Sequence, residues 1–261
     1  MNVSDVYVQK ERTESGVLLL RLTNPRLLNA MCLPMREQLL DELLAAEQDE
    51  SIKGVVITGD GTKAFSAGAD INELALRTSA SELSRASLVR RNLTTTIEDF
   101  AKPVVAAING HCLGAGLELA LACDVRVAAE SATFGLPEIN LGVIPGSGGT
   151  QRLSRLVGLG WAMRMALSGE PITTTTAYQI GLVTDVVEGP ELLPAAVRLS
   201  ESLGAKSEFA FGAAKRAVRS SLDIDLKSGL DVERYLFALC VDTPQKADAI
   251  EAFRSRMRRG Q

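Results

Sequence analysis

The sequence predicts an α/β fold with a helical C-terminal region, and two patterns carry this prediction. Up to about residue 187, short runs rich in Val, Ile and Leu alternate with longer segments of helical periodicity, which is the pattern of an α/β core. Beyond that point apolar residues recur at helical spacing only. We therefore predict two parts, an α/β core over residues 1–190 and a helical region over residues 191–261.

The N-terminal third is predicted to contain a hairpin, a helix and a buried strand. Val3–Glu11 and Val17–Leu22 read as two short strands around a Glu-Ser-Gly turn. Leu33–Gln48 has one apolar face at helical spacing, with acidic residues on the other. Lys53–Thr58 is a short apolar run before a Gly-Asp-Gly turn, which indicates a buried strand.

The middle of the chain continues the alternation. Ser81–Phe100 is predicted as a helix whose arginines (Arg85, Arg90 and Arg91) form a solvated face. The predicted elements after it are strand Val104–Ile108, buried helix Gly114–Ala122, strand Asp124–Ala129, a helix from Thr150 to Val157 and strand Leu182–Val187. The order strand, strand, helix recurs in this part of the chain. Four further helices are predicted to follow: Pro190–Leu203, Glu208–Ser221, Leu226–Cys240 and Pro244–Met257.

Composition narrows the class of protein. Of 261 residues, 46% are hydrophobic and 23% are charged, which is ordinary for a globular protein. The net charge of −4 gives no support to nucleic-acid binding as the main activity. The four cysteines form no Cys-x-x-Cys pair, and one histidine cannot complete a Cys/His zinc site. We expect reduced, buried cysteines, no metal and no nucleic-acid partner.

The sequence does not predict a membrane location. The N-terminal residues lack the apolar core of a signal peptide. The longest apolar run, residues 103–123, contains Asn109, His111 and Glu118, which makes it too polar to span a bilayer. We expect a cytoplasmic protein.

Two isolated carboxylates point to a site. Glu118 is the only charged residue between Lys102 and Asp124, and Glu138 is the only one between Glu130 and Arg152. Both segments are rich in Gly, Ala, Leu, Ile and Val, so both should be largely buried. A buried carboxylate costs several kcal/mol unless it is paired, hydrogen-bonded or neutralised. One explanation is acid/base chemistry in a pocket; the other is that each glutamate caps backbone N–H groups or pairs with a buried arginine.

Small residues follow two of the predicted strands and suggest an anion-stabilising site. The loops AFSAGADI and NGHCLGAGLE would let a ligand approach backbone N–H groups. The amides of Ala69 and Ala115 are the candidate donors of an oxyanion hole; alternatively, the small residues only permit close packing. The segment GSGGT at residues 146–150 marks a helix start and, less strongly, a phosphate site.

Three segments resemble the signatures of the enoyl-CoA hydratase/isomerase, or crotonase, superfamily. They are AFSAGADINEL, KPVVAAINGHCLGAGLELALACD and FGLPEINLGVIPGSGGTQRL, with weaker similarity in NPRLLNAM and DAIEAFRSR. The resemblance implies a spiral of ββα units and a C-terminal helical module that forms homotrimers, often paired as hexamers. It implies a CoA thioester as substrate, with no other cofactor.

The resemblance also assigns roles to residues. It places the oxyanion hole at Ala69 and Ala115, and it matches Glu118 and Glu138 to the two glutamates of family members that hydrate. It implies further CoA contacts at Arg26, Ala64, Ala67, Asp70, Ile71, Asn72, Phe253 and Arg256. Ala115 stands where Gly is common, and the chain ends short of the usual Lys/Arg-Pro-x-Phe sequence, which puts the last two contacts in doubt.

The expected activity is that of a lyase of fatty acid metabolism, an enoyl-CoA hydratase that adds water to trans-2-enoyl-CoA. The alternatives on the same scaffold are double-bond isomerisation and hydration of a branched, cyclic or dienoyl-CoA. A non-catalytic RNA-binding protein of this fold is a distant alternative. The segment from Leu74 to Arg91 is expected to set the depth of the acyl pocket.

Overall fold

The computed structural model describes residues 6–84 and 87–259 and divides into two compact units. The units are Met1–Leu203 and Gly204–Gln261. The helix α8 (Leu192–Gly204) therefore groups with the first unit, whereas the boundary predicted from the sequence falls before it, at residue 190.

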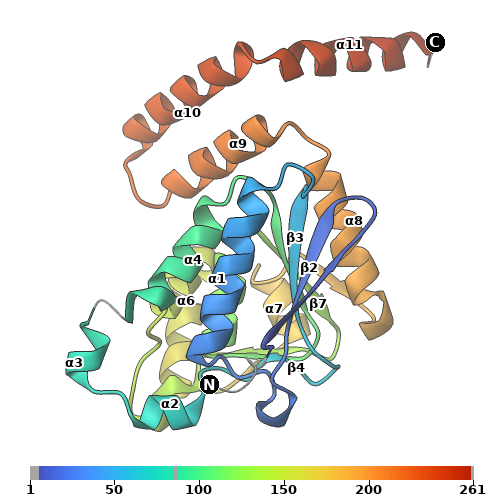
Figure 1. Cartoon of the computed structure of the whole chain (residues 1–261). Helices are drawn as coiled ribbons and strands as arrows, with labels where there is room; N and C mark the ends of the chain where they lie inside the picture. Colours follow the sequence, from blue (N-terminus) through green and yellow to red (C-terminus); the bar gives the residue numbers. More distant parts are fainter. Residues whose placement is uncertain (1–5, 85–86, 260–261) are drawn as a thin grey trace. The chain divides into compact units, whose positions relative to one another are not determined.

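The first unit contains a large and a small sheet (Figure 1). Within the described residues, the large sheet has six strands in the order β1-β2-β3-β5-β7-β10, and the small sheet has four in the order β4-β6-β8-β9. All neighbours pair in parallel except β1 with β2 and β8 with β9. The bounds are β1 Val8–Arg12, β2 Val17–Leu22, β3 Gly54–Gly59, β4 Ala64–Ser66, β5 Val104–Ile108, β6 His111–Leu113, β7 Val125–Ala129, β8 Thr133–Gly135, β9 Ile172–Thr173 and β10 Asp185–Val187.

Consecutive strands alternate between the two sheets. The pairs β3–β4, β5–β6 and β7–β8 each place their first strand in the large sheet and their second in the small one, and helices follow each pair. This arrangement confirms the predicted α/β fold of ββα units. Because parallel strands lie side by side with their carboxyl ends at one edge, the loops after them converge there, where ligands of α/β proteins bind.

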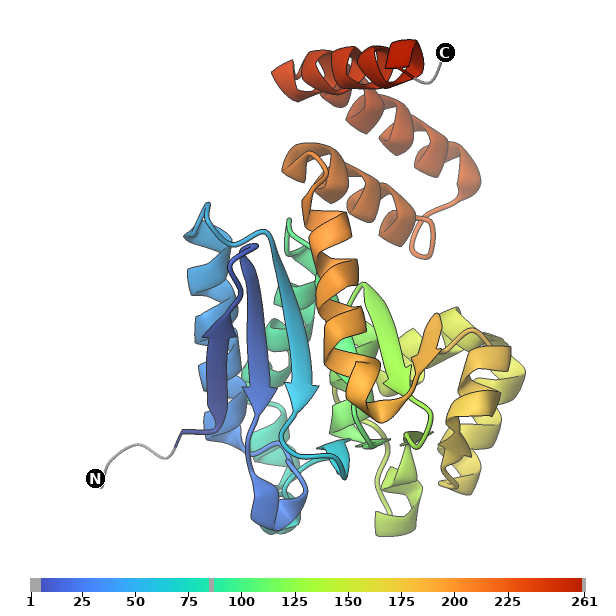
Figure 2. The same cartoon turned by 90° about the vertical axis from the view of Figure 1, so that its right-hand side faces the viewer.

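The large sheet is buried on both faces, as expected for parallel strands. In β2, Leu18 and Leu20 belong to a core shared with α1 (Leu33–Gln48) and α4 (Leu88–Asp99). Val17 and Leu19, which point to the opposite face, pack with Leu192 and Ala196 of α8, among others. Figures 1 and 2 show α1 and α4 on one side of the sheet and α8 on the other.

The remaining helices complete the first unit. They are α2 Ile71–Ala75, α3 Ser79–Glu82, α5 Ala115–Ala122, α6 Gly149–Ser168, α7 Thr174–Gln179 and the 3-10 turns η1 Pro25–Leu27, η3 Pro137–Leu141 and η4 Gly189–Glu191. The prediction of one helix over residues 81–100 is wrong, because Thr78 caps a separate short helix α3, and α4 starts at Leu88. Residues 85 and 86 lie outside the described residues. Helix α6 runs beyond the predicted Val157, with a break in helical geometry at Gly158 (φ 78°, ψ 162°).

Two other expectations need correction. Strand β1 starts at Val8 rather than Val3, and residues 3–5 lie outside the described part of the chain. The segment around Glu138 is not largely buried, because Ile139 and Leu141 of η3 and Ile144 after it are exposed. The segment around Glu118 is buried throughout α5, as predicted.

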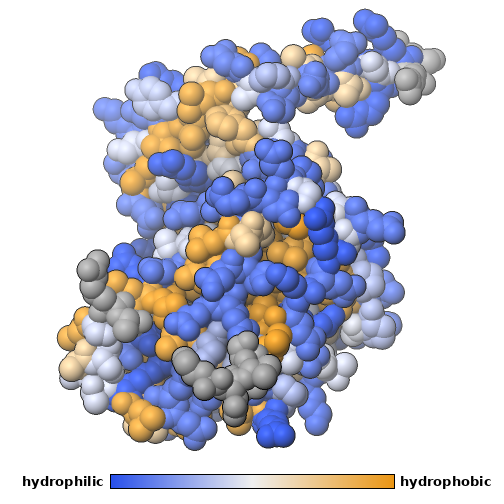
Figure 3. All heavy atoms as spheres, viewed as in Figure 1, coloured by the Kyte–Doolittle hydropathy of each residue, from blue (hydrophilic) through white to orange (hydrophobic). Residues whose placement is uncertain are grey.

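The second unit consists of helices α9 Glu208–Ser220, α10 Leu226–Val241 and α11 Pro244–Arg259. Helices α9 and α10 pack against each other, yet neither has a buried residue. Large apolar side chains such as Val218, Leu226 and Phe237 stay exposed, and Figure 3 shows apolar surface over this part. Among the described residues, no helix combines the length and the apolar character that crossing a bilayer requires.

Candidate active site

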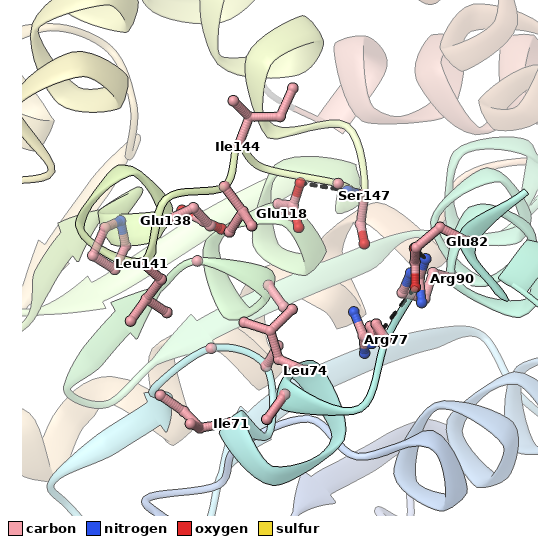
Figure 4. Close-up of a pocket in the computed structure, with 18 of the residues that line it drawn as sticks. Ile71, Leu74, Arg77, Glu82, Arg90, Glu118, Glu138, Leu141, Ile144 and Ser147 are labelled. Carbon is pink, nitrogen blue, oxygen red and sulfur yellow. Dashed lines mark hydrogen bonds and ion pairs between the residues drawn. The ribbon is translucent and has the colours of Figure 1, made fainter. Parts of the chain in front are cut away.

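A pocket of about 980 Å³ lies in the first unit, and both predicted glutamates line it (Figure 4). Its walls come from the loop before α2, the segment through α3 to α4, the start of α5, and the loop between η3 and α6. Glu118, Glu138, Ala69 and Ala115 all line it. The converging loops of the ββα units therefore form the site, as their order in the sequence predicts.

Glu118 is held by the first turn of α6. The residue is 2% exposed, and its Oε1 accepts hydrogen bonds from the backbone N–H groups of Ser147 (2.6 Å) and Gly149 (2.8 Å). Two N–H donors at a helix N-terminus stabilise a negative charge there. The glycine segment thus binds the protein's own carboxylate at these two amides, where the sequence also allowed a phosphate. Glu118 does cap a helix, as one explanation proposed, but it also faces the pocket.

Gly148 and Gly149, which lie next to Glu118 in space, leave no room for larger side chains. A Cβ on Gly149 would lie 3.1 Å from both Cγ and Oε1 of Glu118 and 2.9 Å from Cβ of Pro145. Gly148 before it has φ +104°, a left-handed conformation that side chains disfavour. The two glycines therefore allow the start of α6 to approach the carboxylate within hydrogen-bond distance.

Glu138 has a different environment. It lies in the 3-10 turn η3 after β8, and its Oε2 is buried without a hydrogen-bond partner among the described residues. Burial raises the pKa of Glu138 to about 7; its own backbone N–H lowers the pKa, and the charge of Glu118 raises it further. Near neutral pH a large fraction of Glu138 is therefore protonated and able to donate a proton.

The two candidate amides lie on adjacent loops. A Cβ built on Gly68, whose φ is +113°, would be 3.9 Å from the backbone N of Ala115. Ala115 is the first residue of α5, so its N–H has no partner within the helix. Across the described residues, no hydrogen bond to another part of the chain uses the N–H of Ala69 or Ala115. Two unpartnered amides beside a pocket are the arrangement that an oxyanion hole requires.

Basic residues on another wall were missed or misjudged. Arg36, Arg77 and Arg90 line the pocket, and Glu82 pairs with Arg90 and, at 3.7 Å, with Arg77. The prediction that Arg90 lies on a solvated face is wrong, because α3 folds Glu82 against it. Arg91 is exposed, as predicted, and Arg85 lies outside the described residues. Leu74, Arg77, Glu82 and Arg90 do confirm that the segment from Leu74 to Arg91 contributes to the pocket.

Comparison with known proteins identifies the family. A family model described as "Enoyl-CoA hydratase/isomerase" matches residues 12–258. The chain belongs to the enoyl-CoA hydratase/isomerase family. It is therefore an enzyme of the crotonase superfamily, whose members act on acyl-CoA thioesters.

Relatives of the same family cover the chain almost completely. It is 45% identical to the 2,3-dehydroadipyl-CoA hydratase of Escherichia coli, covering 96% of each chain. It is 35% identical to the short-chain-enoyl-CoA hydratase of Clostridium acetobutylicum, covering 97% of this chain and 95% of that one. The crystal structure of an enoyl-CoA hydratase from Bacillus anthracis superposes with a TM-score of 0.91 at 35% identity, over 96% and 97% of the two chains. These relatives support hydration as the chemistry of this family member.

Of the other CoA contacts predicted from the family resemblance, only some line the pocket. Ala67 and Ile71 line the pocket, whereas Ala64 is buried inside β4. Asp70 caps α2 by accepting from the N–H of Asn72 at 2.8 Å, and neither residue lines the pocket.

Three predicted contacts lie further along the chain or on exposed turns. Arg26 is exposed on η1. Phe253 and Arg256 are exposed on α11, in the second compact unit. Their CoA contacts stay predictions. Within the described residues, no group of three or more His, Cys, Asp or Glu side chains is arranged to hold a metal ion.

Proposed function

We propose that the protein catalyses reversible syn addition of water to a trans-2-enoyl-CoA, giving a 3-hydroxyacyl-CoA. One observation carries the proposal: two carboxylates with different environments share a pocket with two unpartnered backbone amides. Two nearby carboxylates in different environments are able to divide the acid and base roles between them. The relatives' names cover several acyl groups, so they support the reaction type without selecting the acyl chain.

The thioester oxygen would sit between the amides of Ala69 and Ala115. As water attacks C3, negative charge moves onto this oxygen, and each N–H donor stabilises the enolate-like state; loss of one such donor typically costs ~2.7–4 kcal/mol. Ala115 keeps its donor although it carries a methyl group, because the backbone supplies the hydrogen bond.

Glu118 would orient the water and take one of its protons as the oxygen bonds to C3. Glu138 would then deliver its own proton to C2, which completes the addition. Glu118 ends with one proton more and Glu138 with one fewer, so a proton returns between them before the next cycle. Proton transfer by a placed carboxylate contributes about 10²–10⁴-fold to the rate.

Loss of the conjugated-thioester absorbance, followed across a panel of straight-chain and branched enoyl-CoAs, tests the proposal. We expect saturable consumption, and NMR of the product formed in D₂O should show syn placement of the hydroxyl and the new C2 deuteron. A shifted double bond without added water would indicate an isomerase instead. Absence of turnover on every enoyl-CoA would contradict the proposal.

Two further expectations accompany this function. We propose that the reaction needs no cofactor besides the CoA of the substrate. We also propose that the exposed apolar residues of the C-terminal helices are covered in a homotrimer or a dimer of trimers, because an apolar surface of this kind usually marks an interface. Light scattering during size-exclusion chromatography measures that mass, and a monomer at micromolar concentration would contradict it. The cytoplasmic location and the pathway stay predictions.

A further inference from the structure

A buried arginine in the pocket has no anionic partner. Arg36 lies on α1, is 3% exposed and lines the pocket. Its Nε has no hydrogen-bond partner among the described residues, and its Nη2 only reaches the carbonyl of Met31 at 3.5 Å. Burying a charge without an ion partner is costly, because solvation is lost and not replaced. The contacts of Arg36 within the described residues do not offset this cost.

The surrounding charges leave this wall of the pocket positive. Arg77 has Glu73 at 3.8 Å and Glu82 at 3.7 Å, and Arg90 also pairs with Glu82. Arg36 forms no ion pair with a described carboxylate. Three guanidinium groups, from α1, the segment after α2, and α4, thus meet two carboxylates here, Glu73 and Glu82, and neither carboxylate pairs with Arg36.

Arg36, Arg77 and Arg90 line the same pocket as Glu118, and their charges act on one another. Burial lowers the pKa of Arg36 to about 10; the charges of Arg77 and Arg90 lower it as well, and that of Glu118 raises it. Arg36 is therefore still a cation at neutral pH. In Figure 4, Arg77, Glu82 and Arg90 gather on one side of the view, Glu138 and Leu141 lie on the other, and Glu118 lies between them.

The buried position of Arg36 determines which end of a ligand reaches it. If the thioester oxygen lies at Ala69 and Ala115 and C3 at Glu118, the acyl chain beyond C3 extends from Glu118 into the remaining part of the pocket, which Arg36 also lines. The CoA moiety is large and polar and has to extend toward solvent. A group that contacts a 3% exposed guanidinium is therefore part of the acyl chain.

We propose that the natural substrate carries a carboxylate at the far end of its acyl chain, and that Arg36, assisted by Arg77 and Arg90, binds it. This inference rests on the proposed function and specifies its substrate class. A planar guanidinium binds a carboxylate through two parallel hydrogen bonds, which gives geometric selectivity as well as attraction. The substrate carboxylate would pair with Arg36, which has no ion partner among the described residues, whereas a methyl terminus would leave this guanidinium buried and unpaired.

Two other roles for Arg36 make different predictions. If Arg36 only stabilised the charge on Glu118, its replacement would slow all enoyl-CoAs equally. If it bound a CoA phosphate, replacement would weaken all CoA thioesters equally. Only a role in recognising the acyl terminus separates substrates that share CoA and chain length but differ in the terminal group.

The experiment compares matched pairs of saturated, unreactive thioesters by calorimetry: succinyl- with butyryl-CoA, adipyl- with hexanoyl-CoA, and suberyl- with octanoyl-CoA. We expect at least one carboxylated member to bind at least about 30-fold more tightly than its methyl-ended partner, because truncating one side of a buried charge pair costs 2–5 kcal/mol. Arg36→Met should abolish this preference and leave the methyl-ended ligand within about threefold. Arg36→Lys should restore part of it.

Arg91→Met is the matched control, because Arg91 lies on α4 next to Arg90 but is exposed and outside the pocket. It should keep the wild-type preference. If the wild-type protein binds both members of every pair equally, the inference is overturned. This measurement needs no variant, so the inference can be tested even if Arg36→Met folds poorly. Equal weakening of both members by Arg36→Met overturns it too. The binding preference is measured without turnover. If the protein shows this preference but hydrates no enoyl-CoA, the proposed function is contradicted and the binding role of Arg36 is not.

Discussion

The walls that carry Glu118 and Glu138 differ in how they treat the same functional group. The start of α6 gives Glu118 two backbone N–H donors, so the protein stabilises its charge. The turn η3 gives Glu138 burial and an unpartnered Oε2, so the protein disfavours its charge. An unequal distribution of hydrogen-bond donors thus gives two glutamates in one pocket different environments, and the proposed mechanism uses this difference to assign one as base and the other as acid.

The largest effect is expected from replacing Glu118, and two substitutions separate its roles. Glu118→Gln keeps an oxygen that accepts from Ser147 and Gly149 but cannot take a proton, so kcat should fall about 10²–10⁴-fold with little loss of stability. Glu118→Ala also leaves both amides without a partner, which costs about 1–3 kcal/mol per group. Steady-state kinetics and denaturant unfolding measure the two effects. Wild-type turnover by Glu118→Gln would reduce Glu118 to a helix cap.

Glu138→Gln should also lower kcat by about 10²–10⁴-fold, because the amide cannot donate a proton to C2. Its stability should not fall, since Oε2 of Glu138 has no partner to lose. Affinity for a saturated acyl-CoA, measured by calorimetry, should be unchanged. Glu130→Gln, at an exposed position, serves as the control and should behave like wild type. Equal kcat in both variants would remove Glu138 from the mechanism.

The pH dependence should be the next largest effect. Hydration uses protonated Glu138, whose pKa is about 7, so kcat/KM should fall as pH rises above 7, approaching tenfold per pH unit. The reverse reaction should fall in parallel, because the overall equilibrium takes up no proton. Rates between pH 5 and 9 in both directions check this, and a flat profile above pH 7 would contradict the acid role.

Glu138 should also make the free energy of unfolding depend on pH. The direction of this dependence should be opposite to that of an ordinary ion-paired carboxylate. Its pKa is raised on folding from 4.5 to about 7, so the folded state binds more protons between these values. The free energy of unfolding contributed by this group is therefore greatest below pH 4.5 and decreases as pH rises through 7. Comparing wild type with Glu138→Gln by urea unfolding at several pH values isolates this contribution.

The smallest effect is expected at Gly114, which precedes α5 and lies beside Glu138. Its φ is +50°, and an added Cβ would lie 3.0 Å from Oε1 of Glu138. Gly114→Ala should cost about 1–3 kcal/mol of backbone strain and also displace Glu138. Gly61→Ala provides the control, because its φ is +74° but an added Cβ meets nothing within 4 Å. Both variants should lose stability, and only Gly114→Ala should lose activity; equal activities would show that Glu138 tolerates the crowding.

Sequence patterns predicted the elements whose periodicity is local and long. Strands β2 and β5 and helix α1 have the predicted bounds, because their apolar residues repeat over five or more positions. Strands β4, β6 and β8 have three residues each, and their pairing depends on distant partners, so no local signal marked them. The exposed loop after Glu138 was misjudged because apolar residues that line a pocket resemble core residues in composition.

Only some residues of the candidate site could be predicted from the sequence. Glu118 and Glu138 stood out because each is the only charge in an apolar segment. Arg36 was missed, although helical spacing places it one turn before Leu39 and Leu40 on the apolar side of α1, and that position was the available signal. Arg90 depended on α3 folding back with Glu82, which the run of polar residues did not indicate.

Oε1 of Glu118 accepts from the N–H of Ser147, just before α6, and from that of Gly149, its first residue, so the start of α6 positions an oxygen that the proposed mechanism uses. A residue inserted between Ser147 and Gly149 would change the spacing of these two amides, and Oε1 of Glu118 would lose one of its donors. Beyond Gly158 the helix direction changes, so length variation there leaves the amides in place. We therefore expect the chain to tolerate length changes in the far half of α6 better than at its start.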